Sequence, residues 1–178
     1  MIAEALAESG DARALPLVER LRRRQPVEAD LVLARLRRRQ GRADEAVTLL
    51  CRALIGLRKD PWPLQPIAGR GLDLAMAMAE GKKAVAARLY PALAQPYSVL
   101  FLEDRRLRAL LAVASQVDNA HAAQALHRLE PHVPWQRDIL TFRARCYRDV
   151  GDPLAATAVS DLQRYLENTP TAFGDTLD

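Results

Sequence analysis

Arginine is the residue type with the most obvious binding chemistry in this sequence. Of the 26 basic residues only Lys59, Lys82 and Lys83 are lysines, so all the others are arginines. The planar guanidinium forms paired hydrogen bonds with carboxylates and phosphates, so clustered arginines can bind either group. A GC-rich genome also enriches arginine and alanine, and this compositional explanation requires no binding site.

The three histidines are poorly spaced for metal binding. His121, His127 and His132 do not stand three or four residues apart, the spacing that aims two imidazoles of one helix at a metal ion. The sequence also contains no glycine-rich phosphate loop, no HExxH motif and no nucleophile elbow. We therefore expect solvent-facing histidines, no metal, no cofactor and no enzymatic activity.

Glu103 and Asp104 are adjacent acids that could suggest acid–base catalysis. Neighbouring residues on a helix face different directions, so the two carboxyl groups cannot act together on one substrate. Helical spacing instead predicts surface ion pairs of Glu103 with Arg106 and of Asp104 with Arg108.

The cysteines and the N-terminal segment indicate the cellular compartment. Cys51 and Cys146 lie far apart in apolar helical patterns, so we expect buried free thiols, as in a reducing environment. The segment from Met1 to Glu4 lacks the basic and apolar regions of a signal peptide. No run approaches the roughly 20 apolar residues needed to cross a bilayer. We expect a soluble, cytoplasmic protein with no membrane contact.

The elements that position the arginines are predicted to be helices. Hydrophobic residues make up 49% of the chain and aromatics 5%, so alanine and leucine fill the core, as in closely packed helices. Apolar residues recur at three- and four-residue steps, and no strand-like alternation is present. Turn signals recur 31 to 40 residues apart. They lie at Gly10-Asp11, Gly41-Arg42, Gly81-Lys82, Asp118-Asn119 and Gly151-Asp152.

These signals predict ten helices in five pairs. Gly41 should adopt the positive φ of a helix end, Asp152 should cap the last helix, and Pro91 should kink or end its helix. The first pair is expected over Ile2 to Ser9 and from about Ala14, the second on either side of Gly41 within 27–60, and the third over 67–80 and 82–95. The fourth pair is expected over 98–117 and 120–129, and the helices of the last pair begin at Trp135 and Pro153.

The proline-rich segment from Asp60 to Pro66 is predicted to be an elbow, because closely spaced prolines cannot continue a helix. We expect Trp62 to pack into the groove between repeats and fix their angle. In the following helix, Gly69 and Gly71 should let neighbouring backbones approach closely.

The order of small and large apolar residues around two of the turns resembles the tetratricopeptide repeat. The first match comprises Leu33, Ala34, Gly41, Ala46, Leu50 and Ala53; the second comprises Ala144, Tyr147, Gly151, Ala156, Leu162, Leu166 and Pro170. Asp30 and Leu140 depart from the pattern where an aromatic is usual, and so does Arg37 in place of tyrosine. The resemblance implies an all-α, right-handed α-solenoid of about five antiparallel helix pairs. It implies one domain over 1–170, followed by a frayed tail over 171–178.

The same resemblance suggests a binding surface, because the first helix of each tetratricopeptide pair lines the concave face. It places Leu31, Arg35, Arg38 and Arg39 there in the second pair, Ala68, Gly71, Ala75 and Met78 in the third, Arg105 and Arg108 in the fourth, and Asp138, Thr141, Arg145 and Arg148 in the last. The candidate partner-binding residues are Arg35, Arg38, Arg39, Met78, Arg108, Arg145 and Arg148. Arginines on either side of an uncharged floor would suit a peptide with acidic groups or a free C-terminal carboxylate. In the alternative interpretation, these arginines are solvated and paired with Glu28, Asp30, Asp44 or Asp149.

Three functions follow as expectations. The first is a non-catalytic scaffold or adaptor that binds a protein or peptide, with self-association through an end repeat as a further expectation. The second is a docking or regulatory part of a larger bacterial enzyme, because the segment from Pro134 to Leu166 faintly resembles repeat regions attached to spermidine-synthase-like proteins. The third is a nucleic-acid-binding repeat. The net charge of +4 and the lack of aromatic residues interleaved with basic ones argue against this third function.

Overall fold

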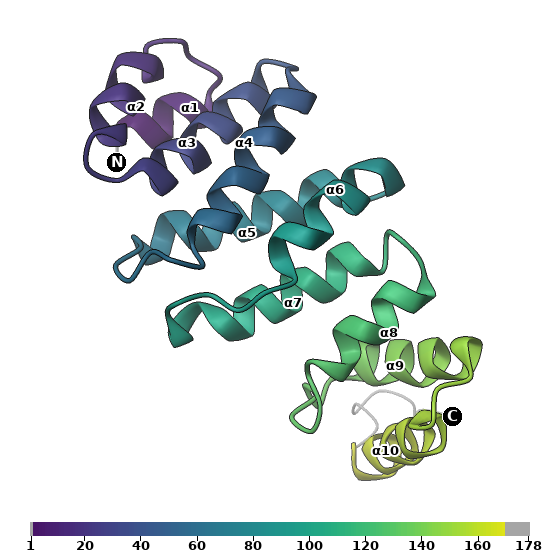
Figure 1. The fold of residues 1–178 in the computed structure, drawn as a ribbon. Helices are drawn as coiled ribbons and strands as arrows, with labels where there is room; N and C mark the ends of the chain where they lie inside the picture. The colour runs from purple at the N-terminus through teal and green to yellow at the C-terminus, as the bar shows by residue number, and fades with distance from the viewer. Residues whose placement is uncertain (1, 170–178) are drawn as a thin grey trace, which may run out of the picture. The chain divides into compact units, whose positions relative to one another are not determined.

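The computed structural model describes residues 2–169, and these residues contain ten α-helices, one 3-10 helix and no β-strand. The all-α class predicted from the sequence is therefore confirmed (Figure 1). The predicted tail over 171–178 lies outside the described residues. The helices are α1 (Ile2–Glu8), α2 (Ala14–Arg22), α3 (Pro26–Arg39), α4 (Ala43–Gly56), α5 (Gln65–Ala79), α6 (Lys83–Leu93), η1 (Leu100–Leu102), α7 (Glu103–Ala114), α8 (Asn119–His127), α9 (Arg137–Val150) and α10 (Ala155–Asn168).

The helices fall into two compact units. The division lies between Val117 and Asp118, so α1 to α7 belong to the first unit and α8 to α10 to the second. This boundary falls inside the predicted fourth pair. The single domain over 1–170 and the five-pair solenoid remain predictions.

Alternate helices lie side by side in the first unit. α1 packs against α3, α3 against α5, and α5 against α7, while α4 packs against α6 (Figure 1). The helices that follow one another along the chain, α3 with α4 and α5 with α6, also pack together. Each helix therefore buries its apolar stripe against several neighbours, mostly through leucine and alanine.

Glycine sets the turns between consecutive helices. Gly10, Gly41, Gly81 and Gly151 have φ values of 78°, 75°, 65° and 69°, in the left-handed region that residues with a side chain rarely adopt. The positive φ predicted for Gly41 is confirmed.

Glycine also permits close helix packing in α5. A Cβ atom added at Gly71 would lie 2.6 Å from Cδ2 of Leu31 on α3. One added at Gly69 would overlap the guanidinium of Arg105 on α7. At both glycines the space of a missing Cβ is therefore filled by a side chain of the neighbouring helix, and the close approach of backbones stays a prediction.

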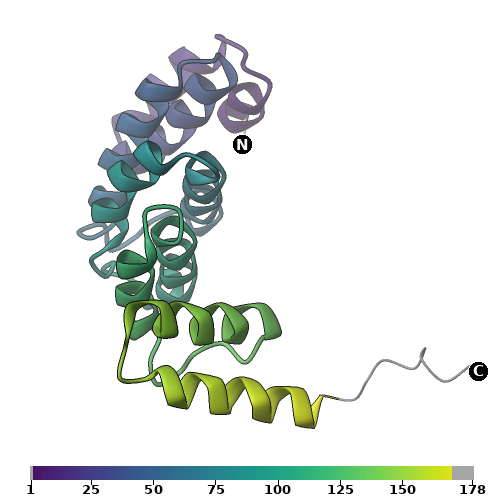
Figure 2. The ribbon, with the colours of Figure 1, turned by 90° about the vertical axis from the view of Figure 1, so that its right-hand side faces the viewer.

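The second unit is organised around a buried arginine. Figure 2 shows α9 and α10 side by side, joined at one end by a short turn. Arg143 of α9 is 2% exposed and donates to Glu130 Oε1 at 2.7 Å and to Asp161 Oδ2 on α10 at 2.8 Å. The phenol of Tyr147 also donates to Glu130, at 3.2 Å. These bonds tie α9 both to α10 and to the loop that precedes α9.

Two predicted helix starts are wrong. The helix expected over 98–117 begins at Glu103, because Ser98 is held outside it by hydrogen bonds from its amide and hydroxyl to the Leu57 carbonyl. The last helix begins at Ala155, and Asp152 accepts a hydrogen bond from the Leu154 amide in the preceding turn instead of acting as its N-cap. The helix containing Pro91 ends soon after the proline, at Leu93, as expected.

The packing role predicted for Trp62 is also wrong. Its side chain is 85% exposed, so it does not fill a groove between helices. The loop is held instead by Ser98, whose hydroxyl donates to the Asp60 carbonyl, and by Glu28, which accepts from the Leu64 amide at 2.7 Å.

Within residues 2–169, none of the helices combines the length and the hydropathy required of a membrane span.

Candidate functional site

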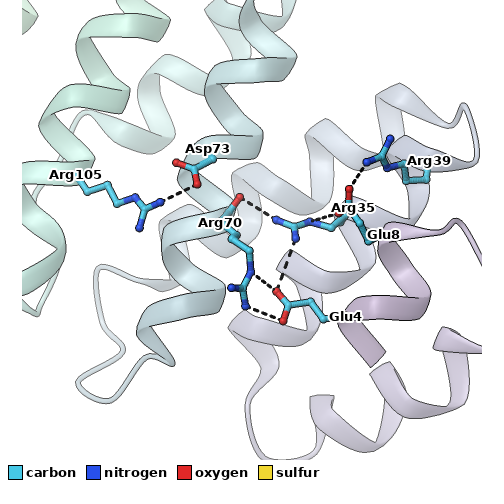
Figure 3. A network of polar contacts seen from close by, with 7 residues as sticks. All are labelled: Glu4, Glu8, Arg35, Arg39, Arg70, Asp73 and Arg105. Atoms are coloured by element: carbon cyan, nitrogen blue, oxygen red, sulfur yellow. Dashed lines mark hydrogen bonds and ion pairs between the residues drawn. The ribbon is translucent and has the colours of Figure 1, made fainter. Parts of the chain in front are cut away.

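A row of linked charges runs across four helices of the first unit. Figure 3 shows the carboxylates and guanidiniums of α1, α3, α5 and α7 pointing toward one another along neighbouring helices. Its members are Glu4 and Glu8 on α1, Arg35 and Arg39 on α3, Arg70 and Asp73 on α5, and Arg105 on α7. We call these seven residues the charge ladder.

The α1–α3 part of the charge ladder is centred on Glu8. Arg39 forms an ion pair with Glu8, and Nε of Arg35 lies 3.4 Å from Oε2 of the same carboxylate. The hydrogen bond from Arg39 is the main cause that lowers the pKa of Glu8 below its ordinary value of 4.5, against the opposing effect of burial. Glu8 is therefore ionised at neutral pH and partly neutralises two predicted binding arginines.

The α1–α5 part of the charge ladder is a bidentate pair. Arg70 donates from Nε and Nη2 to the two carboxylate oxygens of Glu4, at 2.6 and 2.7 Å. Arg35 lies between these helices, with Nη1 3.8 Å from Glu4 and Nη2 donating to the Arg70 carbonyl at 3.1 Å. Arg35 therefore joins three helices, and its guanidinium is largely engaged within the protein. The α5–α7 end is formed by Arg105, which donates to Asp73 at 2.7 Å.

A surface hollow lies beside the ladder. Its lining includes the three arginines that the repeat pattern places on the concave face of the second pair, Arg35, Arg38 and Arg39. Arg38 is exposed and forms no ion pair or side-chain hydrogen bond within residues 2–169. We call this the α3/α5 hollow, and its full lining is Glu8, Arg35, Arg38, Arg39, Arg70, Asp73, Leu74 and Ala77.

The uncharged floor predicted from α5 is not on the surface. Met78 is 5% exposed, and Ala68, Gly71 and Ala75 are buried as well. These residues hold α5 in the core. Of the two apolar residues that line the α3/α5 hollow, Ala77 is exposed, whereas Leu74 is 4% exposed and belongs to the core like Met78.

Arg108 is engaged as the sequence predicted. It donates from Nε to Asp104 at 3.0 Å, one turn earlier on α7. Glu103 pairs with Arg106, also as predicted, but Arg106 is 2% exposed, so this is not a surface pair. The Arg106 guanidinium also donates to the Leu93 carbonyl at the end of α6, which ties α6 to α7.

The candidate residues of the second unit lie on α9. Asp138, Thr141 and Arg145, which the repeat pattern places on the concave face, border one surface hollow together with Arg137 and Phe142. The guanidinium carbon of Arg145 stands 5.8 Å from the Phe142 ring centroid, within cation–π range. Arg148, one turn further along α9, is also exposed. Within residues 2–169, neither Arg145 nor Arg148 forms an ion pair.

The carboxylates proposed as alternative partners of these arginines have other contacts. Asp30 binds Arg22 and Arg52 from the helices on either side of α3, and Asp44 binds Arg88. Glu28 accepts from the Leu64 amide, and Asp149 accepts from Asn119. Arg35 and Arg39 of α3 pair with α1 instead, a partner that their sequence positions do not indicate.

Buried charged residues are the class that the sequence did not lead us to predict. Arg106 has helical spacing to the buried Leu102, Ala109 and Leu110, so its position on the apolar stripe could have indicated that it is buried. Arg143 stands in the same relation to Leu140 and Tyr147. Asp30, at a position where the repeat pattern has an aromatic, is 5% exposed and neutralised by two arginines.

The histidines, cysteines and acidic residues were compared with the arrangement that a metal site requires. No group of three or more His, Cys, Asp or Glu side chains is placed to hold a metal ion in the described part of the chain. His127 contacts Asp152 at 2.7 Å and is exposed. Cys51 and Cys146 are free thiols, the first half-buried and the second buried.

Comparison with protein-family models, with curated proteins and with solved structures gave no match. The function is therefore inferred from the geometry of this chain itself.

Proposed function

We propose that this protein is a non-catalytic interaction module that binds an acidic segment of a partner protein in the α3/α5 hollow. The observation that carries the proposal is the position of Arg38. Its guanidinium is exposed at the hollow and forms no ion pair within residues 2–169, while two further arginines of α3 border the same hollow. An unpaired guanidinium is suited to carboxylate recognition, because it forms paired hydrogen bonds with a carboxylate.

The charge of the hollow supports an acidic ligand. Four arginines and two carboxylates line it, so a positive charge remains after internal pairing. Arg39 and Glu8 are each about half exposed, and exposed ion pairs contribute only about 0–1 kcal/mol. A carboxylate of the partner can therefore replace Glu8 at Arg39 at little cost while it also binds Arg38. The exposed Ala77 provides apolar contact for the partner's side chains.

The interleaved carboxylates favour a peptide over nucleic acid. Glu4, Glu8 and Asp73 stand between the arginines of the charge ladder and would repel a phosphate backbone along its length. A peptide can place its carboxylates opposite selected arginines. Phosphate-backbone binding would also weaken steeply with salt and show little sequence preference, which distinguishes the two ligands experimentally.

The wider arrangement belongs to the same proposal. Successive packing of α1, α3, α5 and α7 is the pattern that a right-handed tetratricopeptide-like solenoid would produce on its inner face. A docking or regulatory role beside a larger enzyme is one form of this function, with the enzyme as the partner.

The test is quantitative affinity capture from the native host, with mass spectrometry to identify the proteins retained. The variant Arg38→Ala/Arg39→Ala removes the two exposed arginines of the hollow, and Lys82→Ala/Lys83→Ala removes the same charge elsewhere on the surface. We expect a specific partner to be retained by the wild type and the control but lost from the first variant. Equal retention by all three proteins, with helical circular dichroism unchanged, would refute the assignment of the site.

A further inference from the structure

A second groove lies between α1 and α2, away from the residues that line the α3/α5 hollow. It has a volume of about 780 Å³ and an apolar floor that includes Ile2, Leu17 and Leu21. Ile2 is 76% exposed, and the two leucines are half-buried. Ala14 and Val18, on the inward face of α2, are fully buried, so the groove leucines are additional to those that hold the helix in the fold.

The rim of the groove is basic. Arg20, Arg23 and Arg24 line it, and all three are exposed. None of the three forms an ion pair or side-chain hydrogen bond within residues 2–169. Arg22 on the same helix is different, because it binds the buried carboxylate of Asp30. The sequence Arg22-Arg23-Arg24 therefore contains one structural arginine and two that remain available for an external carboxylate.

Part of the groove follows the helical period of α2. Leu17 and Leu21 are four residues apart and form an apolar stripe on α2. Arg20 on α2, together with Arg23 and Arg24 just after the helix ends at Arg22, forms a basic stripe beside it. A ligand that matches both stripes must offer apolar groups at each turn and carboxylates beside them. An α-helix with leucines at three- and four-residue steps and glutamates on the flank has this arrangement.

We propose that the groove between α1 and α2 docks an acidic amphipathic helix of another protein. The apolar face of that helix covers Ile2, Leu17 and Leu21, and its carboxylates pair with the three rim arginines. Charge complementarity selects this ligand, since a neutral or basic helix would leave the guanidiniums without partners beside an apolar interface.

The experiment uses three synthetic fluorescein-labelled helices and fluorescence anisotropy with the full chain. The first helix carries leucines at i, i+4, i+7 and i+11 with flanking glutamates. The second has the same composition in scrambled order, and the third has lysine in place of glutamate. We expect the first to bind at least ten times more tightly than the other two. Equal binding of the scrambled helix would overturn the proposal.

Protein variants locate the site. Arg20→Glu/Arg24→Glu should weaken binding of the acidic helix at least tenfold, whereas Lys82→Glu/Lys83→Glu, which changes the net charge equally, should alter it less than twofold. Arg38→Ala should also leave it within twofold, which separates this groove from the α3/α5 hollow. Because Arg20 and Arg24 are exposed, reversing their charge should leave the fold intact, which circular dichroism checks.

Leu17→Gln tests the apolar floor independently of charge and should weaken binding of the acidic helix at least fivefold. Unchanged binding by this variant or by Arg20→Glu/Arg24→Glu would place the helix elsewhere. Light scattering tests whether a second copy of this chain occupies the groove. A molecular mass that doubles with protein concentration in the wild type but not in Arg20→Glu/Arg24→Glu would assign the groove to that second copy and overturn the proposal.

Discussion

Arg35 on α3 lies 3.4 Å from the Glu8 carboxylate on α1, measured from Nε to Oε2. The first helix therefore supplies counter-charge to arginines that the repeat pattern assigns to partner binding. Glu8 serves Arg39 in the same way. Arg38 lies beside this cluster and forms no ion pair within residues 2–169, so the proposed binding of a carboxylate depends on this residue.

The ionisation of Glu8 predicts a loss of stability in acid. The folded pKa of Glu8 lies below the ordinary value of 4.5, mainly through the hydrogen bond from Arg39, so folding favours the ionised form. This contribution is complete above pH 4.5 and is lost as the pH falls below 4.5 through the folded value. In Glu8→Gln, urea unfolding measured from pH 7 to pH 3 should show a shallower decline than in the wild type. A parallel decline in both proteins would contradict the role of this carboxylate.

Arg143 is expected to be essential for the second unit. Arg143→Met removes the buried cation and leaves Glu130 and Asp161 without their shared partner, which should lower the free energy of unfolding by about 3 kcal/mol. The exposed Arg164→Met on α10 is the matched control and should change it by less than about 0.5 kcal/mol. Chemical denaturation followed by circular dichroism measures both. Similar stabilities of the two variants would show that the buried network contributes little.

Two glycines of α5 should respond differently to substitution by alanine. Alanine in place of glycine inside a helix ordinarily stabilises by about 0.5–1 kcal/mol. At Gly71 the new Cβ would lie 2.6 Å from Leu31, a buried core residue, so Gly71→Ala should instead destabilise by about 1–3 kcal/mol.

At Gly69 the new methyl group would meet the far end of Arg105, a flexible and half-exposed side chain. Gly69→Ala should therefore leave thermal stability unchanged or slightly higher, apart from a weakened Arg105–Asp73 pair. Thermal melts of the two single variants measure these effects. A Gly71→Ala protein as stable as the wild type would mean that α3 and α5 pack less closely at Gly71 than the contact with Leu31 indicates.

The two thiols should react slowly and in a fixed order. Burial raises the pKa of Cys51 and that of Cys146, which lowers the thiolate fraction of each near neutral pH. Cys146 is 1% exposed and donates to the Asn119 carbonyl, whereas Cys51 is only half-buried. Titration with Ellman's reagent should modify Cys51 first and Cys146 only with unfolding. Cys51→Ala should abolish the reaction of the native protein.

Local rules account for what the sequence predicted correctly. The positive φ of Gly41 follows from the chemistry of a helix end, and the Glu103–Arg106 and Asp104–Arg108 pairs follow from the geometry of one helix. These features depend on residues within a few positions of each other. Periodicity likewise fixed the all-α class without reference to distant contacts.

The errors concern contacts between residues distant in the sequence. Pairing of Arg35 with Glu8 depends on how α1 packs against α3, which no local pattern specifies. Ser98 and Glu28 hold the loop of Trp62 through hydrogen bonds to its backbone, so the loop does not depend on packing of the indole, which is exposed. Met78 has the helical spacing of the predicted face, but it is 5% exposed and lies on the buried side of α5.

The most direct test of acidic-segment binding in the α3/α5 hollow is an anisotropy titration with fluorescein-labelled hexaglutamate. An Arg20→Glu/Arg24→Glu background removes binding at the second groove. In that background, Arg38→Ala should weaken the affinity about threefold, and Glu8→Gln, which releases Arg35 and Arg39 from their counter-charge, should strengthen it about threefold. If both substitutions leave the dissociation constant unchanged, the hollow is not the binding site.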